Sequence, residues 1–103
     1  MIQHHKQNCP LCHSAAEYCF ADYEKRKHFR CPTCVEFQIT DTAEVKLNAA
    51  PAAWRAEYSA KAREVVPDRV LCISVPSGMR SAGVAYEALR GESMERKDLP
   101  PCR

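Results

Sequence analysis

Two pairs of cysteines constrain this chain more than any other feature of its sequence. The pairs are Cys9-Pro10-Leu11-Cys12 and Cys31-Pro32-Thr33-Cys34, and eighteen residues lie between them. Two such pairs indicate a four-thiolate site, which satisfies the tetrahedral preference of zinc. Four thiolates leave no coordination position for water or substrate. We therefore expect Cys9, Cys12, Cys31 and Cys34 to hold one structural Zn²⁺ ion.

The length of 103 residues allows one small domain, in which a metal cross-link would add to a modest core. The sequence has no long apolar run, and its N-terminus lacks the apolar stretch of a signal peptide. We expect a cytoplasmic protein without a membrane partner, in which thiols stay reduced. On that view Cys19 and Cys72 are small core residues and Cys102 is a spectator.

The two cysteine pairs resemble the knuckles of the zinc-ribbon family and are similar to those of rubredoxin. The Cys-Pro-x-Cys form occurs twice, and the resemblance covers about residues 7–40. It implies a zinc ribbon, with iron as the less favoured metal. Such knuckles commonly carry glycine after the second cysteine, whereas this chain has His13 and Val35 there and no glycine before Gly78. Because positive φ strains a β-branched residue, we expect the second knuckle to close differently.

The sequence predicts an α+β fold that begins with this zinc ribbon over residues 1–40. Apolar and polar residues alternate over 16–21 and 35–40, and residues 27–30 run into the second knuckle. These segments predict a three-stranded antiparallel sheet. In the last strand Val35, Phe37 and Ile39 are expected on one face.

Residues 41–91 are predicted to form an extension packed on the ribbon, in the order helix, helix, strand, helix. Asp41 and Glu44 indicate the start of a short helix, and Pro51 suits the first turn of a second helix that reaches about Val65. Its apolar stripe contains Trp54, Tyr58, Ala62 and Val65. The apolar segment 70–75 predicts a strand that could extend the ribbon's sheet with both faces covered. A further helix over 82–90 would stop at Gly91, and 92–103 would be a flexible tail.

The charge balance argues against a protein that binds nucleic acid mainly through phosphates. Fifteen basic and thirteen acidic residues give a net charge of +2, which four thiolates and one zinc ion reduce to about zero. The leading hypothesis is a non-enzymatic zinc-ribbon interaction module with a protein partner. It would act as an adaptor or regulator of a protein or protein–nucleic acid assembly. Small free-standing ribbons of this kind resemble bacterial or phage accessory proteins.

Direct DNA or RNA binding is the second hypothesis, and it uses the basic hairpin at 25–30. Phosphate contacts would come from four cations, with Tyr23 or Phe29 stacked on a base. These cations are Lys25, Arg26, Lys27 and Arg30. The plainer interpretation is a solvated hairpin tip that partly offsets the charge of the zinc–thiolate cluster.

A third hypothesis is a nucleotide- or phosphate-binding unit that uses the loop at 76–83. Such a loop at the start of a helix can offer N–H groups to an anion, with contacts from Ser77, Gly78, Arg80 and Ser81. Its spacing matches neither nucleotide-binding fingerprint, so an ordinary strand-to-helix turn is favoured. Neither cysteine pair lies at the start of a helix after a strand, which disfavours thioredoxin-like redox chemistry. We identify no nucleophile–base pair and no open metal position, and we therefore predict no enzyme.

Overall fold

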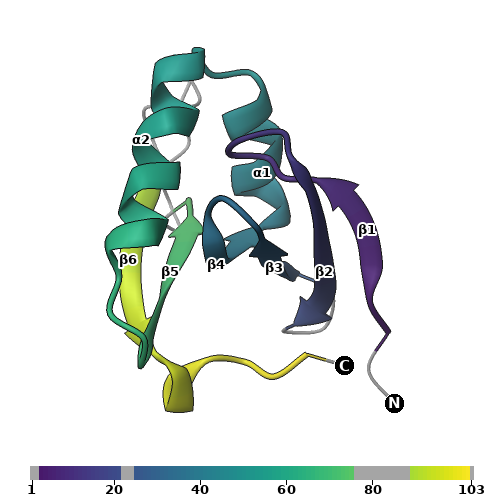
Figure 1. Ribbon diagram of the computed structural model, residues 1–103, viewed down its shortest axis with the longest axis vertical. Helices are drawn as coiled ribbons and strands as arrows, with labels where there is room; N and C mark the ends of the chain where they lie inside the picture. The colour runs from purple at the N-terminus through teal and green to yellow at the C-terminus, as the bar shows by residue number, and fades with distance from the viewer. Residues whose placement is uncertain (1–2, 22–24, 76–88, 103) are drawn as a thin grey trace.

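A six-stranded sheet and two helices make up the described part of the chain (Figure 1). The computed structural model describes residues 3–21, 25–75 and 89–102. The strands are β1 (His5–Asn8), β2 (Ala15–Ala21), β3 (Arg26–Cys31), β4 (Val35–Thr40), β5 (Arg69–Ser74) and β6 (Arg90–Glu95). The helices are α1 (Asp41–Asn48) and α2 (Ala52–Glu64), and a short 3₁₀ turn (Arg96–Asp98) follows β6. The predicted α+β class is confirmed.

The strands lie in chain order across the sheet. All neighbours are antiparallel except β4 and β5, which are parallel. A parallel pair needs a long connection between its strands, and here α1 and α2 form that connection. The three strands predicted for the first forty residues are present as β2, β3 and β4. The predicted strand at 70–75 is β5, which joins the same sheet with residues 70–73 all buried.

Both outer strands of the sheet differ from the prediction. β1 was not predicted, and β6 takes residues that the sequence assigned to the end of a helix and to a tail. Arg90 lies in β6 and not in a helix, Gly91 stops no helix, and residues 92–95 pair with β5. The preceding part of that predicted helix, residues 82–88, and the predicted loop at 76–83 lie outside the described residues.

The two helices begin and pack largely as the sequence indicates. In α1 the N-cap is Thr40, because its hydroxyl accepts a hydrogen bond from the Ala43 N–H at 3.2 Å. The helix start indicated by Asp41 and Glu44 is therefore displaced by one residue, because Asp41 is the first helical residue and not the N-cap. In α2 the predicted stripe is confirmed, since Tyr58 and Ala62 are buried and Trp54 and Val65 pack against the core.

The sheet has two faces of different character. On the face that we call the helical face, Tyr18, Phe29, Phe37 and Leu71 lie side by side in register. Phe29 and Phe37 belong to the same hydrophobic core as Leu47 of α1 and Tyr58 of α2. On the opposite or rear face, the neighbouring row is Cys19, His28, Gln38 and Cys72.

Two residues of β4 differ in exposure from what their residue types indicate. Phe37 and Ile39 are buried as expected, but Val35 is 60% exposed. Gln38 lies on the face opposite Phe37, as the alternation indicates, but it is only 1% exposed although its side chain is polar. The chain after β6 covers Gln38, because it runs back past the strands to pair Cys102 with Ala21 of β2 (Figure 1).

Candidate metal centre

The fold brings the four cysteines of the two knuckles together. Cys9 and Cys12 lie in the turn between β1 and β2, while Cys31 ends β3 and Cys34 immediately precedes β4. Their four Sγ atoms all lie within 4.8 Å of one another. Sulfurs bound at 2.3 Å to a tetrahedral zinc ion lie about 3.8 Å apart. The Sγ–Sγ distance is 3.8 Å for Cys9 and Cys34 and 3.4 Å for Cys12 and Cys31, so the set is the right size for one metal ion.

Both knuckles close in the left-handed backbone conformation although neither has glycine. The φ angle is 63° at His13 and 71° at Val35. The expectation that the second knuckle closes differently is therefore wrong. In the first knuckle the His13 N–H donates to the Cys9 carbonyl at 2.8 Å, and the Leu11 N–H donates to Cys9 Sγ at 3.4 Å. The backbone strain is larger at Val35 than at His13, because β-branched side chains fit this region poorly.

Burial disfavours the charged form of two of the four thiols. Burial raises the pKa of Cys9 far above its ordinary value and raises that of Cys34 to about 11. Burial acts in the same direction on Cys12, but hydrogen bonds with Ser14 and with the Cys31 and Cys34 side chains together outweigh it and lower that pKa to about 6. A bound metal cation would stabilise all four thiolates together.

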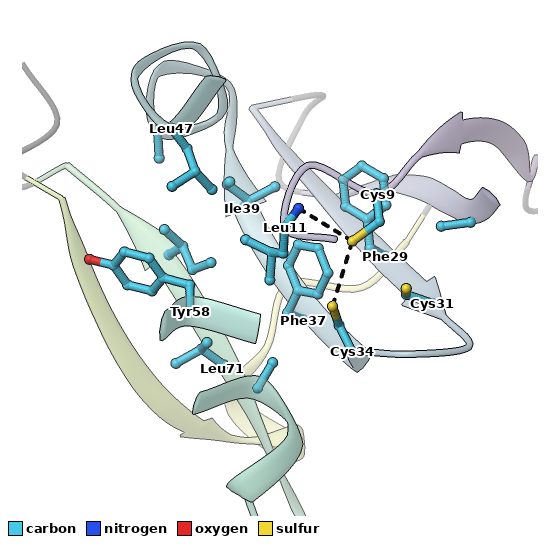
Figure 2. Close-up of a cluster of buried hydrophobic side chains, with 14 of the residues drawn as sticks. Cys9, Leu11, Phe29, Cys31, Cys34, Phe37, Ile39, Leu47, Tyr58 and Leu71 are labelled. Atoms are coloured by element: carbon cyan, nitrogen blue, oxygen red, sulfur yellow. Dashed lines mark hydrogen bonds between the residues drawn. The ribbon is translucent and has the colours of Figure 1, made fainter. Parts of the chain in front are cut away.

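The sulfur cluster is continuous with the hydrophobic core (Figure 2). Cys9 and Cys34 are completely buried, and Phe37 and Leu11 lie beside them in the same core. Ser59 of α2 was missed by the sequence analysis, yet its hydroxyl lies 2.9 Å from Cys34 Sγ. Its position next to Tyr58 and three residues before Ala62, at the edge of the buried stripe, was the signal that could have identified it. The candidate site thus links both knuckles to α2.

The predicted basic cluster is divided between the two faces of the sheet. Lys27 lies on the helical face, where its ammonium group is 3.0 Å from a Glu44 carboxylate oxygen and 2.9 Å from Gln7 Oε1. Arg26 and Arg30 lie on the rear face, because they alternate with Lys27 and Phe29 along β3. Lys25 is exposed next to that strand. The four cations therefore do not form one patch.

The other predicted ligand-binding residues are not brought into a site. Phe29 is completely buried and cannot stack on a base. Tyr23 lies outside the described residues. So do all four residues predicted to contact phosphate, namely Ser77, Gly78, Arg80 and Ser81.

The remaining cysteines behave differently from one another. Cys72 is buried, as predicted. Cys19 and Cys102 form a disulfide, with their Cα atoms 5.7 Å apart and 83 positions apart in sequence. The predictions that Cys102 is a spectator and that all the thiols stay reduced are therefore wrong. Cys19 is buried as expected, but as one half of a cross-link.

Comparisons with protein-family models, curated proteins and solved structures found no match. The likeness to zinc ribbons therefore depends on the four cysteines and their geometry alone. Within the described ranges, neither helix has the length and apolar character needed to cross a membrane.

Proposed function

We propose that this chain is a zinc-ribbon-like, non-enzymatic interaction module of the cytoplasm. In this role it is an adaptor or regulator that binds a protein partner, alone or within a protein–nucleic acid assembly. Zn²⁺ is the metal that best suits four thiolates, and its role is to hold the two knuckles and α2 in place. Iron is the less favoured alternative.

The closed sulfur set is the observation that carries this proposal. Four Sγ atoms lie within 4.8 Å of one another, and Cys9, Cys31 and Cys34 are at most 5% exposed. An ion bound to all four has no position left for water or a substrate. The metal would therefore act through the surfaces that it fixes, and a binding role follows more directly than a catalytic one.

The tip of the second knuckle is the surface that the metal fixes most directly. Pro32, Thr33 and Val35 are exposed there, and Val35 is one of three large apolar side chains that are exposed among the described residues. An exposed apolar side chain on a rigid turn is a suitable anchor for a protein partner. The divided basic run makes direct nucleic-acid binding the weaker proposal.

The test is an affinity pull-down from the native host with the zinc-loaded protein, analysed for both proteins and nucleic acid. Val35→Asn introduces a residue that tolerates positive φ and removes the apolar contact. We expect this variant to lose a defined protein partner, while Val45→Asn on α1 retains it. Recovery of only nuclease-sensitive material, unchanged by Val35→Asn, would favour the nucleic-acid alternative and contradict the proposal.

A further inference from the structure

The segment after β6 crosses the rear face of the sheet and is fixed at two places. We call this segment, Arg96–Cys102, the C-terminal strap. At its first end, Arg96 pairs with Glu36 at 2.6 Å and donates from Nε to the Pro67 carbonyl at 2.7 Å. At its other end, Cys102 is cross-linked to Cys19 and bridges to Ala21.

Between its two ends the strap is held weakly. Pro100 and Pro101 have no backbone N–H, so this part of the strap cannot pair as a strand. The Gln38 amide donates to the Pro100 carbonyl at 3.4 Å, which is long for a hydrogen bond. Leu99 and Pro100 are half-buried, and Pro101 is exposed. The disulfide is therefore the main fixture of the distal half of the strap.

The strap forms one wall of a pocket of about 330 Å³ on the rear face. The sheet side of the pocket includes Cys19, His28 and Gln38, and the strap side includes Leu99 and Pro100. His28 is held from two sides, because Nε2 lies 2.5 Å from a Glu36 carboxylate oxygen and Nδ1 lies 2.9 Å from the Gln38 amide nitrogen. Gln38 Oε1 is the one buried side-chain polar atom of the described residues without a protein partner. Fixed polar groups of His28 and Gln38 thus lie on the sheet side of a largely apolar pocket behind the strap.

We propose that the C-terminal strap is a redox-controlled wall of this pocket. A dithiol reductant would attack the Cys19–Cys102 disulfide, form a mixed disulfide and then leave as its own oxidised form. Two electrons and two protons pass to the protein, and Cys19 and Cys102 become thiols. The distal half of the strap then separates from β2 while Arg96 stays bound to Glu36. Reduction therefore opens the rear face around His28 and Gln38, and reoxidation closes it.

The accessibility of His28 tests this proposal in the full zinc-loaded protein. Diethyl pyrocarbonate acylates exposed imidazoles, and exposed His13 serves as an internal reference. In the oxidised protein His28 should react much more slowly than His13. After reduction by a phosphine the ratio of His28 to His13 modification should rise several-fold, and reoxidation should restore it.

Two variants make the result specific to the disulfide. Cys102→Ser should show the high His28 reactivity permanently, while it retains its zinc. Cys72→Ser changes a buried cysteine of the same face but not the strap, and it should behave like the parent. An unchanged His28 ratio through the redox cycle of the parent would overturn the proposal, whatever the stability of the variants. Alkylation of both Cys19 and Cys102 under oxidising conditions would also overturn it.

Discussion

Val35 offers a direct test of how the second knuckle closes. Its φ angle is 71°, a conformation that costs an ordinary L-residue about 1–2 kcal/mol. Asparagine adopts this conformation far more readily, because its short polar side chain can hydrogen-bond locally. Val35→Asn should therefore stabilise the folded protein, although it replaces an apolar side chain by a polar one.

The magnitude follows from comparison with two matched positions. Val35 is 60% exposed, and Val45 and Val66 are 65% and 53% exposed, so the same substitution removes a similar contact area at each. Neither control has a positive φ. Relative to Val45→Asn and Val66→Asn, we expect Val35→Asn to gain about 1 kcal/mol, which is the strain that it relieves.

Two assays measure this gain. At a fixed free zinc concentration, about 1 kcal/mol corresponds to a rise in Tm of about 4–8 °C for a domain of this size. Chelator competition should show about fivefold tighter zinc binding, since folding of the knuckle and metal binding are coupled. If Val35→Asn is no more stable and binds zinc no more tightly than the two controls, the knuckle does not close as described.

Three further predictions test the surroundings of the candidate site. Ser59→Ala removes the hydroxyl that contacts Cys34 Sγ and should weaken zinc binding about fivefold, equivalent to about 1 kcal/mol. The control Ser93→Ala, which removes an exposed contact with Arg69, should leave zinc binding unchanged. Gly91→Ala would place a Cβ 2.9 Å from Tyr58 Cε1 and should lower the free energy of unfolding in urea by about 1–3 kcal/mol. The exposed control Glu92→Ala should be nearly neutral, and equal stability of the two variants would refute the packing of β6 against α2. The hydrogen bond from Arg96 lowers the pKa of Glu36 to about 2 from 4.5. The stabilisation of the folded protein by the ionised Glu36 is therefore complete above pH 4.5 and is lost as the pH falls toward 2. The stability difference between the parent and Arg96→Gln should be about 1 kcal/mol at pH 7, because Arg96 is half-exposed, and should narrow below pH 4.5; a constant difference would contradict this pairing.

The parts of the fold that could be predicted are those whose signal is local. Cysteine spacing identified four residues that the fold does bring together, and the helical spacing of Tyr58 and Ala62 identified the buried stripe of α2. The apolar run at 70–75 identified β5 because that strand is covered on both faces. In each case the side chains that are buried or brought together carry the pattern.

The outer strands could not be predicted for the opposite reason. β1 and β6 are each paired on one side only and consist mostly of polar residues. They are held by backbone hydrogen bonds to the neighbouring strands, and such bonds do not require an alternating pattern of apolar and polar residues in the sequence. Gln38 is buried by a segment 62 positions away, and Cys19 pairs with a cysteine 83 positions away. Contacts at such separations are set by topology and not by local sequence.

The knuckles adopt positive φ angles at two residues that are not glycine, which the sequence did not predict for the second knuckle. Position 35 has no glycine, yet its backbone adopts a positive φ beside the four converging cysteines. Metal binding would offset the backbone strain at this position, because the free energy of binding is also free energy of folding.

The most direct test of the account is the metal content and coordination of the purified protein. We predict one zinc ion per chain, with four sulfur ligands at about 2.3 Å in X-ray absorption spectra. Substitution of Cys9, Cys12, Cys31 or Cys34 by serine should abolish this site, while Cys72→Ser should leave it intact. Less than half a zinc ion per chain, with iron also absent, would contradict the central claim.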